Sequence, residues 1–310
     1  MKILKFSLFV FSFFFLAPFS FSQIEDEKIE ISMATVEGAK ISEEEIIKLE
    51  EKLKETPENL VLRAKVLGYY FSRSIKDRQL RKKFQENVLW VIKNKPESQL
   101  AGMPQCELNP HIDGEIYEEG KKLWLENIEK FKENKKVLEN AGNYFMVYDK
   151  EIAEGLFKKL QEIAPENPIY YEKLGHLYSL KMIGKKGKER EEISKKALLQ
   201  YEIAYSFANE IQKFHILEEM AKLSFEANEI EKAKKYSMEL LDKKEGKEGK
   251  WFYGNAIHYG NIVLGKIALK ENKKEEAKKY LIEAGKTPGS PQLNSFGPDF
   301  TLAEELLEAG

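Results

Sequence analysis

Hydrophobic residues recur at three- and four-residue intervals along most of the chain from about residue 41 onward. This spacing predicts a series of amphipathic α-helices, and the sequence has no long runs of the alternating kind that would predict β-strands. Ser42, followed by three glutamates, is typical of a helix start in which the serine is the N-cap. Residues 23–40 are polar and lack such a pattern, so we expect a flexible lead-in there. The sequence therefore predicts an all-α fold.

The order of small and large residues repeats within the helical part of the chain. The clearest copy contains Ala153, Phe157, Leu160 and Pro165, then Tyr171, Leu174, Gly175 and Tyr178. Two antiparallel helices approach closely only where small residues face each other, and a large residue of one helix then fills the gap beside them. We predict the same packing role for matching residues in further copies: Ala197, Tyr201, Ala233, Gly265 and Ala277.

This pattern resembles the tetratricopeptide repeat, whose first helix carries W-x2-L-G-x2-Y and whose second carries A-x3-F. The alanines that mark the second helix are 44, 36 and 44 residues apart, which exceeds the period of the family. The excess falls in residues 183–194 and 243–250, which are rich in Gly, Lys and Glu and are expected to be exposed loops. The resemblance implies a right-handed α-solenoid of antiparallel helix pairs over residues 115–310. The resemblance is weaker over residues 41–95, where we expect N-terminal helical pairs. Residues 96–114, between the two parts, are expected to be an irregular connector.

Four strings resemble a narrower group of uncharacterised bacterial tetratricopeptide proteins: LWLENIEKF, ENAGNYF, EKLGHLYSL and GSPQLNSFGPDFTLAEELLEAG. This group has no known activity to transfer. Its members continue into another aromatic-rich helix, whereas this chain stops at Gly310. Solenoids need a polar cap over the last apolar face, so a missing cap predicts self-association or a mobile end.

The first 22 residues have the composition of a cleavable secretory signal. Lys2 and Lys5 precede an apolar stretch from Phe6 to Leu16, and Ser20-Phe21-Ser22 offers small residues where signal peptidase acts. A spanning helix needs about 20 apolar residues, so this stretch is too short to be a membrane anchor. We therefore expect an exported protein, periplasmic or secreted, with no membrane span.

Charge and cysteine content narrow the function further. The chain carries 50 Lys and Arg against 52 Asp and Glu, a net charge of −2. This balance argues against nucleic acid as a partner, because phosphate binding needs a concentrated basic surface. Cys106 is the single cysteine, so no intramolecular disulfide forms and stability must come from packing.

Candidate chemistry is concentrated in the connector. Cys106, Glu107, His111 and Asp113 fall within eight residues, and one hypothesis is an enzyme or metal-binding protein that uses this loop. The other, which we favour, is an irregular connector that packs over the repeats. The four histidines include no pair at i, i+4 spacing and no HExxH motif. We therefore predict no catalytic residue, no metal and no cofactor.

The resemblance implies a concave groove lined by the first helix of each repeat. The matching positions in this sequence are Asn143, Met146, His176, Ser179, Lys222, Phe225, Lys266 and Lys270. The paired Lys-x3-Asn signature with which family members hold a peptide carboxylate is absent. The lining is apolar near residue 140 and basic near residue 268, which suits a peptide or protein segment as the ligand. The alternative is that these side chains only face water in the groove and bind no ligand. The sequence thus predicts a non-enzymatic protein-binding or scaffold protein of the cell envelope.

Overall fold

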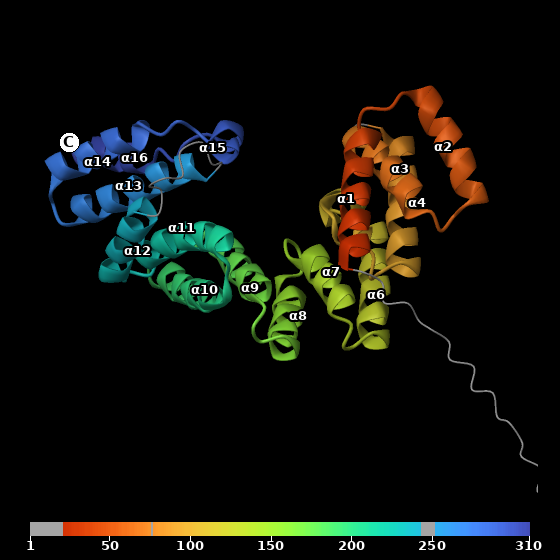
Figure 1. The fold of residues 1–310 in the computed structure, drawn as a ribbon, viewed down its shortest axis with the longest axis horizontal. Helices are drawn as coiled ribbons and strands as arrows, with labels where there is room; N and C mark the ends of the chain where they lie inside the picture. The colour runs from red at the N-terminus through yellow and green to blue at the C-terminus, as the bar shows by residue number, and fades with distance from the viewer. Residues whose placement is uncertain (1–20, 76, 243–251) are drawn as a thin grey trace, which may run out of the picture. The chain divides into compact units, whose positions relative to one another are not determined.

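The computed structural model describes the backbone of residues 21–75, 77–242 and 252–310, and all regular elements in these ranges are helices (Figure 1). The predicted all-α fold is therefore confirmed for the described residues. The chain divides into two compact units, and the boundary falls between Val88 and Leu89. Each unit is described separately below.

The N-terminal unit contains α1 (Phe21–Gly38), α2 (Glu43–Glu55), α3 (Leu60–Arg73) and most of α4 (Arg78–Asn94). The helix start predicted at Ser42 is confirmed. The Ser42 hydroxyl accepts from the Glu45 amide at 3.3 Å, and the Glu45 carboxylate accepts from the Ser42 amide at 2.8 Å. This reciprocal pair satisfies two backbone donors that the first turn of a helix leaves open.

The expectation of a flexible lead-in over residues 23–40 is wrong. Most of that stretch forms α1, which packs against α3. The two helix backbones touch. A Cβ atom added to Gly68 would lie 2.0 Å from the carbonyl oxygen of Thr35, and one added to Gly38 would lie 2.0 Å from that of Lys65. Among the α1 residues whose burial is described, 29–38, the buried ones are Ile31, Ala34, Thr35 and Gly38. Only Ile31 of these is large and apolar, so this part of the buried face leaves little trace in a hydrophobicity pattern.

The C-terminal unit begins with the end of α4 and the connector, which consists of two 3-10 turns (Leu100–Gly102 and Pro104–Cys106) and α5 (Pro110–Asp113). The connector belongs to this unit and packs over the repeats, which is the interpretation favoured from the sequence. The side-chain amide of Asn140 donates to the carbonyls of Pro96 and Ser98, both at 2.8 Å.

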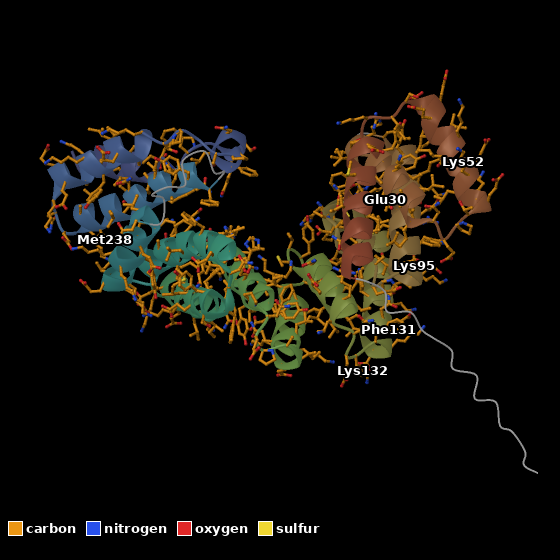
Figure 2. The ribbon with its side chains drawn as sticks, viewed as in Figure 1. Glu30, Lys52, Lys95, Phe131, Lys132 and Met238 are labelled. Atoms are coloured by element: carbon orange, nitrogen blue, oxygen red, sulfur yellow. The ribbon has the colours of Figure 1, made fainter. Side chains whose placement is uncertain are left out.

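Helix α6 (Glu115–Lys130) is followed by four antiparallel pairs whose members are adjacent in sequence and in space (Figure 1). The pairs are α7 (Lys135–Phe145) with α8 (Lys150–Ile163), α9 (Pro168–Lys181) with α10 (Gly187–Phe207), α11 (Glu210–Glu226) with α12 (Ile230–Asp242), and α13 (Tyr253–Lys270) with α14 (Lys274–Gly285). Two short helices follow, α15 (Pro291–Phe296) and α16 (Thr301–Glu308). Exposed side chains such as Lys52 of α2 and Met238 of α12 cover the outer surfaces of the units (Figure 2).

Glycine-to-aromatic contacts recur between the helices of a pair. A Cβ atom on Gly142 of α7 would lie 2.7 Å from the ring of Phe157 in α8, and one on Gly175 of α9 would lie 2.7 Å from the ring of Tyr201 in α10. The absent side chain lets the aromatic ring lie directly on the partner backbone. All residues predicted from sequence to pack the repeats are buried except Tyr171, which is half-buried and donates its hydroxyl to the carbonyl of Pro165 at 2.9 Å.

Candidate functional site

The first helices of the four pairs, α7, α9, α11 and α13, line two adjoining pockets in the C-terminal unit. The larger, called here the α9 pocket, has a volume of about 780 Å³ and is lined by the connector, α7, α9 and α11. The smaller, called the α13 pocket, has a volume of about 290 Å³ and is lined mainly by α11 and α13. Ser179 and Glu219 line both pockets, so the two adjoin, and together they are called the groove.

The groove brings together seven of the eight residues that the sequence placed on the inner face. Asn143, Met146, His176 and Ser179 line the α9 pocket, and Ser179, Lys222, Phe225 and Lys266 line the α13 pocket. Lys270 lies outside both: it is exposed, and its ammonium donates to the Asn228 side chain at 2.6 Å. Ligand binding by these residues stays a prediction.

The α9 pocket holds three half-buried charged groups that have no ion pair among the described residues: Glu107, Glu172 and Lys173. Burial raises the pKa of Glu107 to about 7, although Lys173 opposes the shift. Burial also raises the pKa of Glu172 and lowers that of Lys173. The Lys173 ammonium donates instead to the side-chain oxygen of Asn143 at 2.8 Å. Burial thus favours the neutral form of each of these three groups.

Two histidines and Glu219, whose charge is balanced by a lysine, also line the α9 pocket. His176 and His215 are both open to the groove, but the surrounding protein keeps enough water from His176 to lower its pKa. Burial disfavours the charged form of Glu219, yet Lys222, whose ammonium lies 2.6 Å away, outweighs burial and lowers the pKa of this glutamate. The charge of Glu219 is therefore balanced within the groove wall.

Ion pairs neutralise the cations of the α13 pocket. Arg190 contacts Glu226 at 2.5 Å, and Lys266 contacts Glu305 at 3.4 Å. Lys222 contacts Glu218 and Glu219, and its ammonium also lies 4.5 Å from the ring centroid of Tyr259. Of the two lysines that make the sequence basic near residue 268, Lys266 is thus offset by Glu305 of α16, whereas Lys270 donates to the Asn228 side chain.

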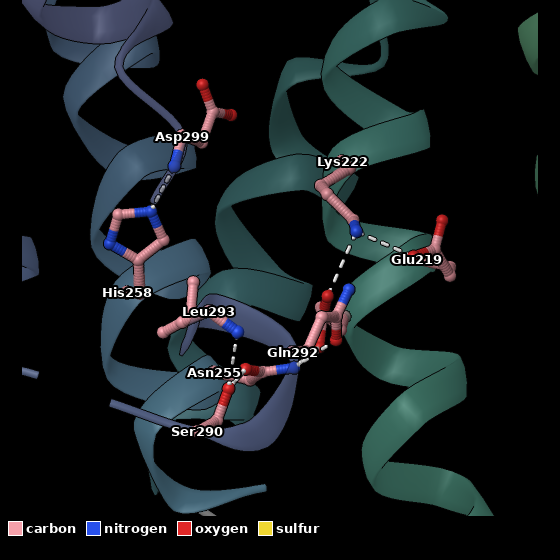
Figure 3. A network of polar contacts seen from close by, with 9 residues as sticks. Glu219, Lys222, Asn255, His258, Ser290, Gln292, Leu293 and Asp299 are labelled. Carbon is pink, nitrogen blue, oxygen red and sulfur yellow. Dashed lines mark hydrogen bonds and ion pairs between the residues drawn. The ribbon is translucent and has the colours of Figure 1, made fainter. Parts of the chain in front are cut away.

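The segment between α14 and α16 lies along the first half of α13, where side chains hold it (Figure 3). The buried side chain of Asn255 accepts from the Ser290 hydroxyl at 2.5 Å and donates to the Gln292 side chain at 2.6 Å. Nε2 of His258 accepts from the Asp299 amide at 2.8 Å, so the imidazole is neutral with its proton on Nδ1, which faces the Ala284 carbonyl at 3.4 Å.

This segment borders both pockets, because Gln292 lines the α9 pocket and Asp299 the α13 pocket. Sequence reasoning did not identify Asn255, His258 or Lys173 as part of the groove region. The partners of Asn255 lie 35 and 37 residues away along the chain, a separation that carries no periodic signal.

The residues of the connector hypothesis do not converge. Cys106 is fully buried, whereas His111 is exposed and contacts the ring of Tyr148 edge-on at 5.9 Å. The Asp113 carboxylate accepts from the Asn109 amide at 2.7 Å and so closes the turn that begins α5. Within the described ranges, no three His, Cys, Asp or Glu side chains are placed to hold a metal ion.

The prediction of a signal peptide in residues 1–22 falls outside the described residues except for Phe21 and Ser22, which begin α1. None of the helices described has both the length and the hydrophobicity that a transmembrane helix requires.

The chain was compared with family models and with curated protein sequences. No family model matches the chain, and no curated protein sequence matches it significantly.

Proposed function

We propose that the chain is a right-handed α-solenoid of the tetratricopeptide type that binds an extended protein segment along the groove of its C-terminal unit. The observation that carries this proposal is that two adjoining pockets are lined by four successive first helices. A lining built from equivalent positions of stacked helix pairs suits an elongated ligand, because each pair contributes a similar set of contacts.

The chemistry of the lining supports a polypeptide ligand. The α9 pocket combines apolar Met146, Val147 and Ile169 with polar Asn143 and Ser179, so it offers both surface for side chains and hydrogen bonds for a backbone. Val147 and Ile169 are 48% and 41% exposed and both line this pocket. A bound segment would remove this surface from water and gain free energy from its burial.

The proposal assigns the protein to the cell envelope as a scaffold or adaptor, on the strength of the predicted signal peptide, and involves no catalytic step. Its partner is a protein or peptide.

Photo-crosslinking tests the proposal. Benzoylphenylalanine in place of Ile169, which lines the groove, is expected to give discrete crosslinked proteins in the envelope fraction of the native host. The matched control is the same substitution at Leu199 of α10, which is 53% exposed and lies outside both pockets. Identical products from both positions, or none from Ile169, would contradict a groove-bound partner.

A further inference from the structure

The α9 pocket carries an excess of negative groups. Its lining includes three glutamates but only one lysine or arginine among the described residues, Lys173. Glu219 is balanced by Lys222 at 2.6 Å, and the Lys173 ammonium is directed to Asn143 at 2.8 Å. Glu107 and Glu172 therefore remain as two carboxylates without an ion pair in the described protein.

Both carboxylates are poorly hydrated where they stand. One carboxylate oxygen of Glu172 is sealed from solvent and has no hydrogen-bond donor among the described residues. Glu107 is half-buried in the connector, and its ionisation is disfavoured to the point that its pKa is about 7. Withdrawing a carboxylate from water without a partner costs free energy, and a cation that enters the pocket with its N–H donors would recover part of it.

Apolar side chains lie beside these carboxylates in the same pocket. Met146, Val147 and Ile169 come from the end of α7 and the start of α9. They provide contact surface for the methylene groups of a long basic side chain and for its apolar neighbours.

We propose that the α9 pocket recognises a lysine or arginine side chain flanked by apolar residues in the bound segment, with Glu107 and Glu172 accepting hydrogen bonds from its cation. This inference rests on the peptide-binding function proposed above and specifies the partner. An acidic segment is disfavoured, since it would meet two unpaired carboxylates and a single lysine that already donates to Asn143.

Selection from a phage-displayed library of random twelve-residue peptides tests the inference. Wild-type protein is expected to enrich peptides with a basic residue between apolar residues, and the Glu107→Gln/Glu172→Gln double variant is expected to lose that preference. Glu162→Gln is the matched control, because Glu162 is exposed on α8 outside both pockets. Far-UV circular dichroism of each variant verifies that the isosteric changes leave the fold intact.

Calorimetry with one enriched peptide adds a readout that depends on the carboxylates themselves. Replacing its basic residue by citrulline, a neutral analogue, is expected to weaken binding about tenfold, the effect of losing one charge-assisted hydrogen bond. Glu107 has a pKa of about 7, so about half of it is protonated near pH 7, and a bound cation favours its ionised form. Binding is therefore expected to release about half a proton from this residue. The measured binding enthalpy should then differ between buffers of unlike ionisation enthalpy.

The outcomes separate this inference from the general function. Enrichment of acidic or uncharged peptides whose binding survives the double variant would overturn the basic-residue specificity and leave peptide binding in place. Failure to enrich any peptide above a bare-surface control would overturn both.

Discussion

Replacement of Gly175 by alanine tests whether close helix contact holds the repeats together. The new Cβ would lie 2.7 Å from the ring of Tyr201, which is 3% exposed. Carbon atoms in contact are ordinarily about 3.5–4.0 Å apart, so the ring or α10 must shift by about 1 Å. Overpacking of this kind costs about 1–3 kcal/mol.

A second effect acts in the opposite direction. Alanine is favoured over glycine in a helix interior by about 1 kcal/mol, so the net destabilisation expected for Gly175→Ala is about 0–2 kcal/mol. Gly155 of α8 supplies the matched control, because nothing lies within 4 Å of a Cβ placed there. Gly155→Ala should therefore stabilise the protein by about 1 kcal/mol, giving the two variants opposite signs.

Urea denaturation followed by circular dichroism measures both effects as shifts of the unfolding midpoint at unchanged slope. The midpoint of Gly175→Ala should fall, and that of Gly155→Ala should rise, relative to the wild type. Equal midpoints for the two variants would refute the reasoning, because they would mean that the space above Gly175 is not filled by the tyrosine.

Three further predictions concern other parts of the chain. Gly68→Ala should detach α1 from α3, because the new methyl group meets backbone that cannot rotate away, and limited proteolysis should then cut between α1 and α2 faster than in wild type. Burial lowers the pKa of His258, so its contribution to stability is full above the unfolded pKa of about 6.5 and is lost as pH falls through the lower folded value. Hydrogen exchange at the Asp299 amide, corrected for intrinsic rates, should accelerate over that range, and an unchanged rate would count against the contact. Cys106 is fully buried, so a thiol reagent should label it only after denaturant is added, and rapid labelling of native protein would contradict its position.

The local pattern of the sequence predicted the all-α fold and most of the residues that are buried between the helices of the repeats. Helix positions follow from three- and four-residue spacing, and the start at Ser42 follows from its own side chain and that of Glu45. The resemblance to the tetratricopeptide repeat placed His176 and Ser179 on the inner face of the helix pairs, and both line the α9 pocket.

Other features depend on which segments meet in three dimensions, and the sequence contains no local sign of them. Helix α1 was missed because the part of it that packs most closely on α3 offers Ala34, Thr35 and Gly38, whose small side chains give little hydrophobic signal. Its contact is made by backbone, and only the tertiary structure shows that Gly68 lies opposite.

The charge of the groove was likewise decided by tertiary structure. The sequence indicated a basic end near residue 268, but Glu305 of α16 folds back to within 3.4 Å of Lys266 and offsets it. Glu107 enters the groove from the connector and forms no ion pair with any residue that the structure describes, which composition alone does not reveal. Helical periodicity is a short-range property that a sequence encodes directly, whereas the balance of charges in a groove is set by side chains that meet only when distant helices pack.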